Sequence, residues 1–255
     1  MTTSGLPLAV VFDFYGTLTD PSRESGRRAL IDSTAAALGV DAMSYWAATS
    51  ESFDQRCRGE LGDTRATLRE LARRCGRKVD EATLDRAVDV HLGAYRELTA
   101  PHPRAVGVLG WLREVGCRVG VLTDCSTELP EIWAETLWPS HVDAVAFSAV
   151  VGHRKPNPAG YLEVTGQLGV HPSDCWFVGD GGSSEHLGAK SVGMRPVLVS
   201  NAAYEVAHLR VDPDSYRPTD VIDDLGDLPD LIHALRKAFP DRRVDQTRGR
   251  RSGCG

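Results

Sequence analysis

Residues 8–17 read Leu-Ala-Val-Val-Phe-Asp-Phe-Tyr-Gly-Thr, and this stretch decides the fold. Its first five residues form an uninterrupted apolar run, which ends at Asp13 and a Gly-Thr turn. Such runs are typical of a strand buried on both faces of a parallel sheet, because a half-exposed strand would alternate apolar and polar residues. We therefore predict a central strand at residues 8–12 with polar residues at its carboxyl end.

Four more segments farther along the chain have strand character. Between them lie amphipathic stretches that end at or near a glycine, as helices commonly do. This alternation predicts an α/β fold with a Rossmann-like parallel sheet. The further predicted strands are residues 118–122, 142–147, 175–178 and 196–199, and the predicted helices between them are 106–115, 159–168 and 184–191.

Residues 21–99 interrupt the alternation. They contain no strand pattern, and an excursion this long is too large for an ordinary connection between a strand and a helix. We interpret it as an inserted α-helical cap, with residues 1–20 and 100–240 forming the core. Inside the insert, Tyr45, Trp46 and Phe53 fall at helical spacing, which favours core packing. The amphipathic segments of the insert are residues 23–38, 42–58, 64–75 and 81–98.

The composition is that of a globular protein that does not bind nucleic acid. The chain has 255 residues, of which 42% are hydrophobic and 25% charged, which excludes a fibrous or largely disordered chain. Its net charge of −6 disfavours a nucleic-acid partner. Residues 241–255 contain five arginines and almost no apolar residues, so we predict a disordered basic tail there.

The six cysteines lie far apart with no C-x-x-C pair, which indicates reduced thiols in a cytoplasmic protein. The sequence also shows neither a signal-peptide pattern nor an apolar run long enough for a transmembrane helix, so no membrane partner is expected. A monomer and a homodimer are both compatible with the sequence.

Polar motifs follow the first four predicted strands. In open α/β folds, ligands bind at the carboxyl ends of the strands. The first strand leads into Asp13-Phe-Tyr-Gly-Thr17, and the second ends in Thr123-Asp124. The third is followed by Arg154-Lys-Pro-Asn-Pro158, and the fourth by Gly179-Asp-Gly-Gly-Ser-Ser-Glu185. Each motif alone is weak, but all four in this order indicate a catalytic site.

Together these motifs resemble those of the haloacid dehalogenase-like hydrolase superfamily, over roughly residues 8–201. The resemblance implies a cap that closes over the strand ends. It also implies a Mg²⁺-dependent phosphatase that hydrolyses a small phosphorylated metabolite through an aspartyl-phosphate intermediate. A carboxylate nucleophile divides a difficult displacement into two easier steps.

The resemblance assigns a role to most of the motif residues. Asp13 is the implied nucleophile, Thr123 the hydroxyl that donates to a phosphoryl oxygen, and Lys155 the cation that offsets the clustered negative charge. Asp124 and Gly16 are expected beside them in the substrate site.

The implied metal site consists of oxygen donors, which Mg²⁺ prefers. Its expected ligands are Asp13, Asp180, the backbone carbonyl of Tyr15, and Glu185. Glu185 has other possible roles: it could act through a water molecule, orient Lys155, or simply face the dipole of its own helix.

Tyr15 departs from the pattern of most phosphatases in the superfamily, which have a second Asp there as general acid and base. Tyrosine at this place is typical of the metal-independent haloacid dehalogenases, whereas Thr123-Asp124 and Gly179-Asp180 follow the metal-binding phosphatases. Arg23, in the first segment of the insert, is a further candidate for binding an anionic substrate, with Arg27 and Arg28 nearby.

Three alternatives remain open at this stage. The first is a metal-independent 2-haloacid dehalogenase, which EDTA would not inhibit. The second is a catalytically weak binding or regulatory member that binds Mg²⁺ and a phosphate mimic without turnover. The third is a phosphoryl transferase.

Overall fold

The computed structural model describes residues 7–204 and 212–238, and its centre is a six-stranded parallel sheet. The strand order is β3-β2-β1-β4-β5-β6, which places β1 between β2 and β4. The predicted α/β sheet is confirmed, and the short strand β6 was not predicted. The strands are β1 (Ala9–Phe12), β2 (Arg118–Thr123), β3 (Ala144–Phe147), β4 (Cys175–Gly179), β5 (Arg195–Val199) and β6 (Asp220–Ile222).

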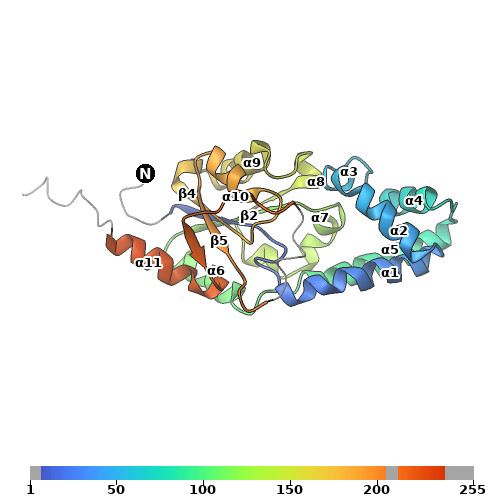
Figure 1. The fold of residues 1–255 in the computed structure, drawn as a ribbon, viewed down its shortest axis with the longest axis horizontal. Coiled ribbons are helices and arrows are strands. Elements are labelled where there is room, and N and C mark those ends of the chain that lie inside the picture. Colours follow the sequence, from blue (N-terminus) through green and yellow to red (C-terminus); the bar gives the residue numbers. More distant parts are fainter. Residues whose placement is uncertain (1–6, 205–211, 239–255) are drawn as a thin grey trace, which may run out of the picture.

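Helices cover both faces of the sheet (Figure 1). Helices α6 (Ala105–Glu114) and α11 (Leu228–Ala238) pack on one face, and α9 (Pro158–Leu168) and α10 (Glu185–Ser191) on the other. Alternate residues of β1 point to the two faces, which explains why the strand is apolar throughout. The shorter helical elements are α7 (Glu128–Ile132), α8 (Ser148–Val151), η2 (Trp133–Glu135), η3 (Trp138–Ser140), η4 (Pro172–Asp174) and η6 (Leu225–Asp227).

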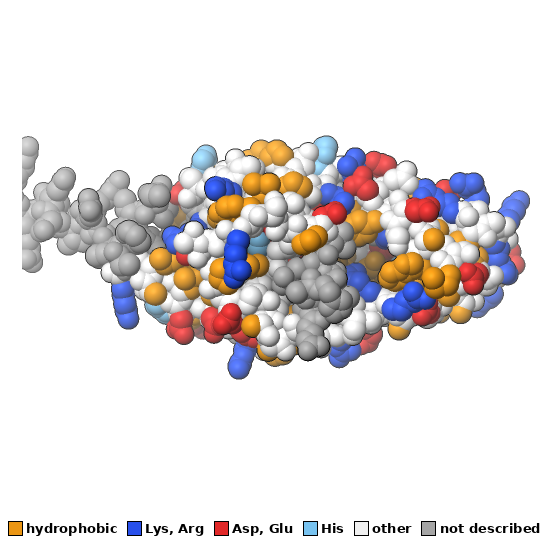
Figure 2. Space-filling model, in the orientation of Figure 1, with side chains coloured by type: hydrophobic (Ala, Val, Ile, Leu, Met, Phe, Trp, Pro, Cys, Tyr) orange, Lys and Arg blue, Asp and Glu red, His pale blue; other side chains and the backbone are white. Residues whose placement is uncertain are grey.

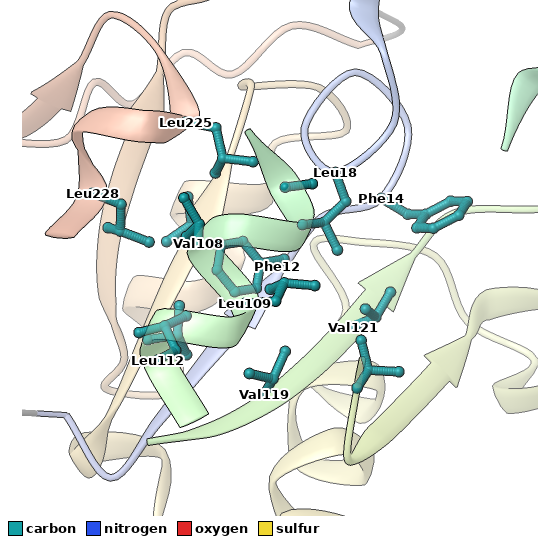
Figure 3. Packing of buried hydrophobic residues seen from close by; sticks show 14 of the residues in the cluster. Phe12, Phe14, Leu18, Val108, Leu109, Leu112, Val119, Val121, Leu225 and Leu228 are labelled. Carbon is teal, nitrogen blue, oxygen red and sulfur yellow. The ribbon is translucent and has the colours of Figure 1, made fainter. Parts of the chain in front are cut away.

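The larger of the two sheet-face cores lies beneath α6. Phe12 of β1 packs there with Val119 and Val121 of β2 and with Leu109 and Leu112 of α6 (Figure 3). All five side chains are fully buried. This packing anchors the carboxyl ends of β1 and β2, from which the first two motifs emerge.

One 3-10 helix and five α-helices between β1 and α6 form the cap, which extends from one end of the sheet (Figure 1). Asp41, Asp63 and Asp80 begin three of them, each accepting a hydrogen bond from the backbone amide three residues later. The predicted insert is therefore helical, although its first segment begins as a 3-10 helix. The elements are η1 (Pro21–Gly26), α1 (Arg27–Leu38), α2 (Ala42–Glu51), α3 (Phe53–Cys57), α4 (Thr64–Arg74) and α5 (Glu81–Leu98).

The cap has a hydrophobic core of its own and is joined to the sheet by two adjacent chain segments. Leu38, Leu68 and Leu84, from three cap helices, are fully buried together. In the connecting segments, Thr19 forms an antiparallel bridge with Pro101, and the Asp20 amide donates to the Ala100 carbonyl at 2.9 Å. The chain thus enters and leaves the cap at one place.

The surface of the described residues carries charged side chains of both signs. These side chains crowd the outer end of the cap (Figure 2). No described helix is both long enough and apolar enough to span a bilayer. The described cysteines, Cys57, Cys75, Cys117, Cys125 and Cys175, are free thiols. The predicted basic tail, residues 241–255, lies outside the described part of the chain.

Candidate active site

The strand order brings three of the four motifs to the middle of one sheet edge. Asp13 follows β1, Thr123 ends β2 and Asp180 follows β4, and β1 pairs with both of the other strands. The Asp13 amide donates to the Val178 carbonyl of β4 at 2.9 Å, which continues the ladder past the end of the strand. Lys155 reaches the same point from the loop between α8 and α9.

A buried lysine joins two carboxylates at this edge. Lys155 Nζ lies 2.5 Å from Asp13 Oδ1 and 2.6 Å from Glu185 Oε2, and all three residues are almost inaccessible to solvent. Desolvation, together with the charge of Asp180, raises the pKa of Asp13 to about 6 despite the opposing effect of Lys155. Burial also raises the pKa of Glu185 well above its ordinary value. The two acids outweigh desolvation at Lys155, whose pKa is raised, so the ammonium stays charged.

Three carboxylates share this small volume, and they suit a hard divalent cation. Oxygens of Asp13, Asp180 and Glu185 all lie within 4.8 Å of one another. One lysine does not balance three acids: the pKa values of Asp13 and Glu185 are raised first by desolvation and further by the neighbouring carboxylates. The donor set therefore fits Mg²⁺. Two points stay predictions: the Tyr15 carbonyl as a ligand, and direct binding of the ion by Glu185.

Two glycines allow the carboxylates to approach one another. A Cβ on Gly179 would meet Glu185 Oε1 at 2.2 Å, so only glycine lets this side chain fold back over the end of β4. Gly16 has φ +76°, and a Cβ there would lie 3.3 Å from Asp180 Oδ2. Glu185 Oε1 also accepts a hydrogen bond from the Gly181 amide at 2.8 Å.

The second motif offers one hydroxyl without a partner and one carboxylate that is already engaged. Thr123 Oγ1 is buried and has no hydrogen-bond partner among the described residues, as expected of a group that binds a ligand oxygen. Asp124 Oδ1 accepts from the Lys155 amide at 2.9 Å, and its Oδ2 accepts from Arg154 Nε at 3.3 Å. Asp124 therefore holds the loop that carries Lys155, although it also lines the cavity described below.

Tyr15 occupies the position that differs from most phosphatases. Its ring contacts Phe14 edge-on, and the Arg27 guanidinium lies 4.5 Å above the ring centroid. The hydroxyl is buried and has no partner in the part of the chain that the structure describes. Desolvation raises the pKa of Tyr15 well above 10, so the phenol is a poor proton carrier near neutral pH.

A cavity of about 450 Å³ lies between the strand ends and the cap. Asp13, Gly16, Asp124, Lys155 and Asp180 form its floor, and α1, α2, α3 and α5 supply the opposite wall. Tyr45, Trp46 and Phe53 all line the cavity. Tyr45 also belongs to the cap core, so core packing alone does not describe this trio.

Three predicted site residues do not line the cavity. Thr123 and Glu185 are buried at the strand ends, whereas Arg23 lies at the surface. Its side chain is 51% exposed and lies 3.5 Å from Glu97 and 4.0 Å from Asp20. Arg27, the first residue of α1, lines the cavity in its place.

Sequence reasoning missed a buried contact between a histidine of the cap and a carboxylate of the core. His91 Nε2 of α5 lies 3.0 Å from Glu128 Oε1 of α7. The Thr34 hydroxyl donates to the Leu30 carbonyl, so it accepts from His91 Nδ1 at 2.9 Å. Burial disfavours the Glu128 carboxylate, but its contacts with His91 outweigh this and lower the pKa of Glu128.

Two other contacts were also beyond the sequence patterns. Arg56 of α3 donates to Ser126 Oγ at 2.7 Å, next to the second motif. Asn201 donates from Nδ2 to the Gly16 carbonyl at 2.7 Å and so fixes the nucleophile loop. The signal for Asn201 was its place just after a predicted strand. Arg56 had no comparable signal, because only the folded cap brings it to Ser126.

Comparisons with known proteins agree with the motifs. A family profile described as haloacid dehalogenase-like hydrolase matches residues 7–193. A phosphoglycolate phosphatase of Pseudomonas putida is 29% identical over 232 residues, which are 86% of this chain and 78% of the relative. A glyceraldehyde 3-phosphate phosphatase of Methanopyrus kandleri is also 29% identical, over 66% of this chain and 71% of its own.

A solved dehalogenase has a similar fold. The L-2-haloacid dehalogenase of Xanthobacter autotrophicus, with chloropropionic acid covalently bound, is 26% identical and superposes with a TM-score of 0.61. The match covers 89% of this chain and 99% of that one. Phosphatases and dehalogenases are thus both among the similar proteins.

Proposed function

The chain belongs to the haloacid dehalogenase-like hydrolases, and we propose that it is a Mg²⁺-dependent phosphatase. Its substrate in this proposal is a small phosphorylated metabolite, a phosphoric monoester. The observation that carries the proposal is the cluster of Asp13, Asp180 and Glu185 around Lys155. This set of charges suits a phosphoryl group bound together with a divalent cation.

Asp13 is the nucleophile in this proposal. Its Oδ1 accepts a short hydrogen bond from Lys155, whereas Thr17 Oγ1 lies 3.5 Å from Oδ2. Oδ2 therefore has the more available lone pairs. It forms a bond to phosphorus as the bond between phosphorus and the ester oxygen breaks. Water then attacks the phosphorus, which releases inorganic phosphate and restores the carboxylate.

The other residues hold the phosphoryl group and balance its charge. Thr123 donates its unpartnered hydroxyl to a phosphoryl oxygen, and Lys155 keeps Asp13 ionised. Asp124 positions the Lys155 loop through the Lys155 amide. The three carboxylates and the Tyr15 carbonyl would hold Mg²⁺, which supplies positive charge to the phosphoryl oxygens when bound.

Phosphate release tests this proposal. Purified protein is incubated with a panel of phosphorylated metabolites and p-nitrophenyl phosphate, with Mg²⁺ or with excess EDTA. We expect phosphate release with Mg²⁺ and none with EDTA. We also expect none from Asp13→Asn, which removes the nucleophile's charge without changing the size of the side chain. Rapid-quench trapping of a phosphoryl group on Asp13 would support the mechanism directly. Phosphate release that persists in EDTA would contradict the metal assignment.

A second candidate function is metal-independent hydrolysis of a small 2-haloacid. Tyr15 and the structural similarity to a haloacid dehalogenase favour it. The carboxylate cluster argues against it, because displacement of a halide by Asp13 needs no cation. Halide release from 2-chloropropionate in EDTA, without phosphatase activity, would establish this function instead.

A further inference from the structure

The cap wall of the cavity is unusually rich in aromatic side chains. Tyr45 and Trp46 come from α2, Phe53 from α3 and Tyr95 from α5, and Tyr15 adds a fifth ring from the nucleophile loop. Leu30 and Leu98 also line the cavity. Such a wall favours an apolar, flat group because rings pack well against rings.

Two buried hydroxyls at this wall have no hydrogen-bond partner. Tyr45 is fully buried, and its hydroxyl meets no acceptor among the described residues; the same holds for the Tyr15 hydroxyl. Buried hydroxyls are rarely left without a partner. A purely hydrocarbon group would leave both unsatisfied, so the expected occupant carries acceptor atoms on an otherwise apolar frame.

The cationic side chains of the cavity are already engaged with the protein. Arg27 Nε lies 2.5 Å from Glu24, and Arg56 donates to Ser126 Oγ and to the Thr49 carbonyl. A second anionic group on the substrate would have to compete with these bonds. The volume, about 450 Å³, lies in the range of about 300–1,000 Å³ found for sites that enclose drug-sized ligands. Both observations disfavour a two-carbon phosphorylated acid as the preferred substrate.

We propose that the cavity selects phosphate monoesters whose alcohol carries a heteroaromatic ring, with Tyr45 donating a hydrogen bond to a ring acceptor. This inference rests on the proposed phosphatase function and deepens it. The phosphoryl group lies on the floor at Asp13. The ring lies against the cap wall, and the chemistry at phosphorus is unchanged.

Four phosphate esters of alkyl alcohols test the ring without changing the type of leaving group. They are pyridin-3-ylmethyl phosphate, benzyl phosphate, glycerol 1-phosphate and 2-phosphoglycolate, each assayed for phosphate release with Mg²⁺. We expect kcat/KM for the pyridyl ester to exceed that of the two non-aromatic esters by about ten-fold or more, from one ring contact and one buried hydrogen bond. Benzyl phosphate should fall between them.

Three variants locate the preference. Tyr45→Phe should raise KM for the pyridyl ester to that of the benzyl ester and leave KM for glycerol 1-phosphate unchanged. Trp46→Leu, at a half-exposed position, should reduce the preference for both aromatic esters. Tyr216→Phe removes a hydroxyl outside the cavity and should change none of the ratios.

The outcomes separate the two proposals. Hydrolysis of glycerol 1-phosphate or 2-phosphoglycolate as efficiently as the pyridyl ester would overturn the aromatic preference and leave the phosphatase function intact. An unchanged preference in Tyr45→Phe would overturn the role of that hydroxyl. Failure to release phosphate from any ester, p-nitrophenyl phosphate included, would overturn both proposals.

Discussion

Tyr15 leaves the proposed reaction without an evident proton donor, and this has a measurable consequence. Its hydroxyl is buried, and desolvation raises its pKa well above 10. A departing alkoxide needs a proton, whereas a phenolate leaves without one. We therefore predict that the protein hydrolyses aryl phosphates much faster than alkyl phosphates, and that Tyr15→Asp raises alkyl phosphate turnover.

The surroundings of Tyr15 set the size of the gain. General acid–base catalysis is typically worth about 10²–10⁴-fold. The Arg27 guanidinium lies 4.5 Å from the Tyr15 ring centroid, so it would stabilise the ionised form of a carboxyl group placed there. Less of the new acid is then protonated near neutral pH, so we expect a gain of about ten-fold to 10²-fold, at or below the lower end of the usual range.

Phenyl and benzyl phosphate provide the assay, because they share a ring but differ in leaving group. The ratio of their kcat/KM values should be large in the parent and fall in Tyr15→Asp. Tyr15→Asn is the matched control, since it opens the same space but carries no acidic proton. Equal rates for the two esters in the parent would refute the reasoning and indicate another proton donor. An equal gain in the Asn variant would show that space, not a proton, limits turnover.

Three further predictions concern the metal cluster, the cap contact and the response to pH. Asp180→Ala should raise the Mg²⁺ concentration for half-maximal phosphate release by about 10²-fold. Lys155→Ala should instead lower kcat, with less effect on that concentration. Identical Mg²⁺ titrations for Asp180→Ala and the parent would contradict the metal assignment. His91→Leu leaves the Glu128 charge buried without its partner and should cost about 3–5 kcal/mol in urea unfolding, of which a variant with leucine at both positions should recover more than half. Desolvation lowers the pKa of His102, so below about pH 6.5 the unfolded chain binds that proton first. The free energy of unfolding should then fall by up to about 1.4 kcal/mol per pH unit as the pH drops, and less steeply in His102→Asn.

Much of the fold could be predicted because its signals are local. The run at residues 8–12 is buried on both faces, and the sheet places it at β1, between two parallel strands. Strand β6 escaped prediction because it has only three residues and begins with Asp220. Helix α7 escaped for a similar reason: its five residues include two acids and a proline, and only tertiary packing explains why Glu128 is buried there.

The candidate site was predictable to the extent that its residues follow strands. Asp13, Thr123 and Asp180 come directly after or at the end of strands, and a parallel sheet brings such positions together whatever the loops do. Lys155 was found through its motif, since its loop is not attached to a strand end. Arg23 and Arg27 show the limit of this reasoning, because neither follows a strand and the packing of the folded cap decides which of them reaches the cavity.

The residues that would choose the substrate could not be separated from those that build the cap. Tyr45 belongs to the cap core and also lines the cavity, so one helix face serves both purposes and has one hydrophobic spacing. A pattern of apolar residues along α2 indicates that one face of the helix is buried. It does not show whether that face packs against another helix or against a ligand. Only the unpartnered Tyr45 hydroxyl distinguishes the two, since a packing residue in a dry core has no reason to keep a buried donor unsatisfied. If both proposals hold, the chemistry is encoded at strand ends, where sequence motifs reveal it, and the selectivity in polar atoms of the cap wall, where only the structure does.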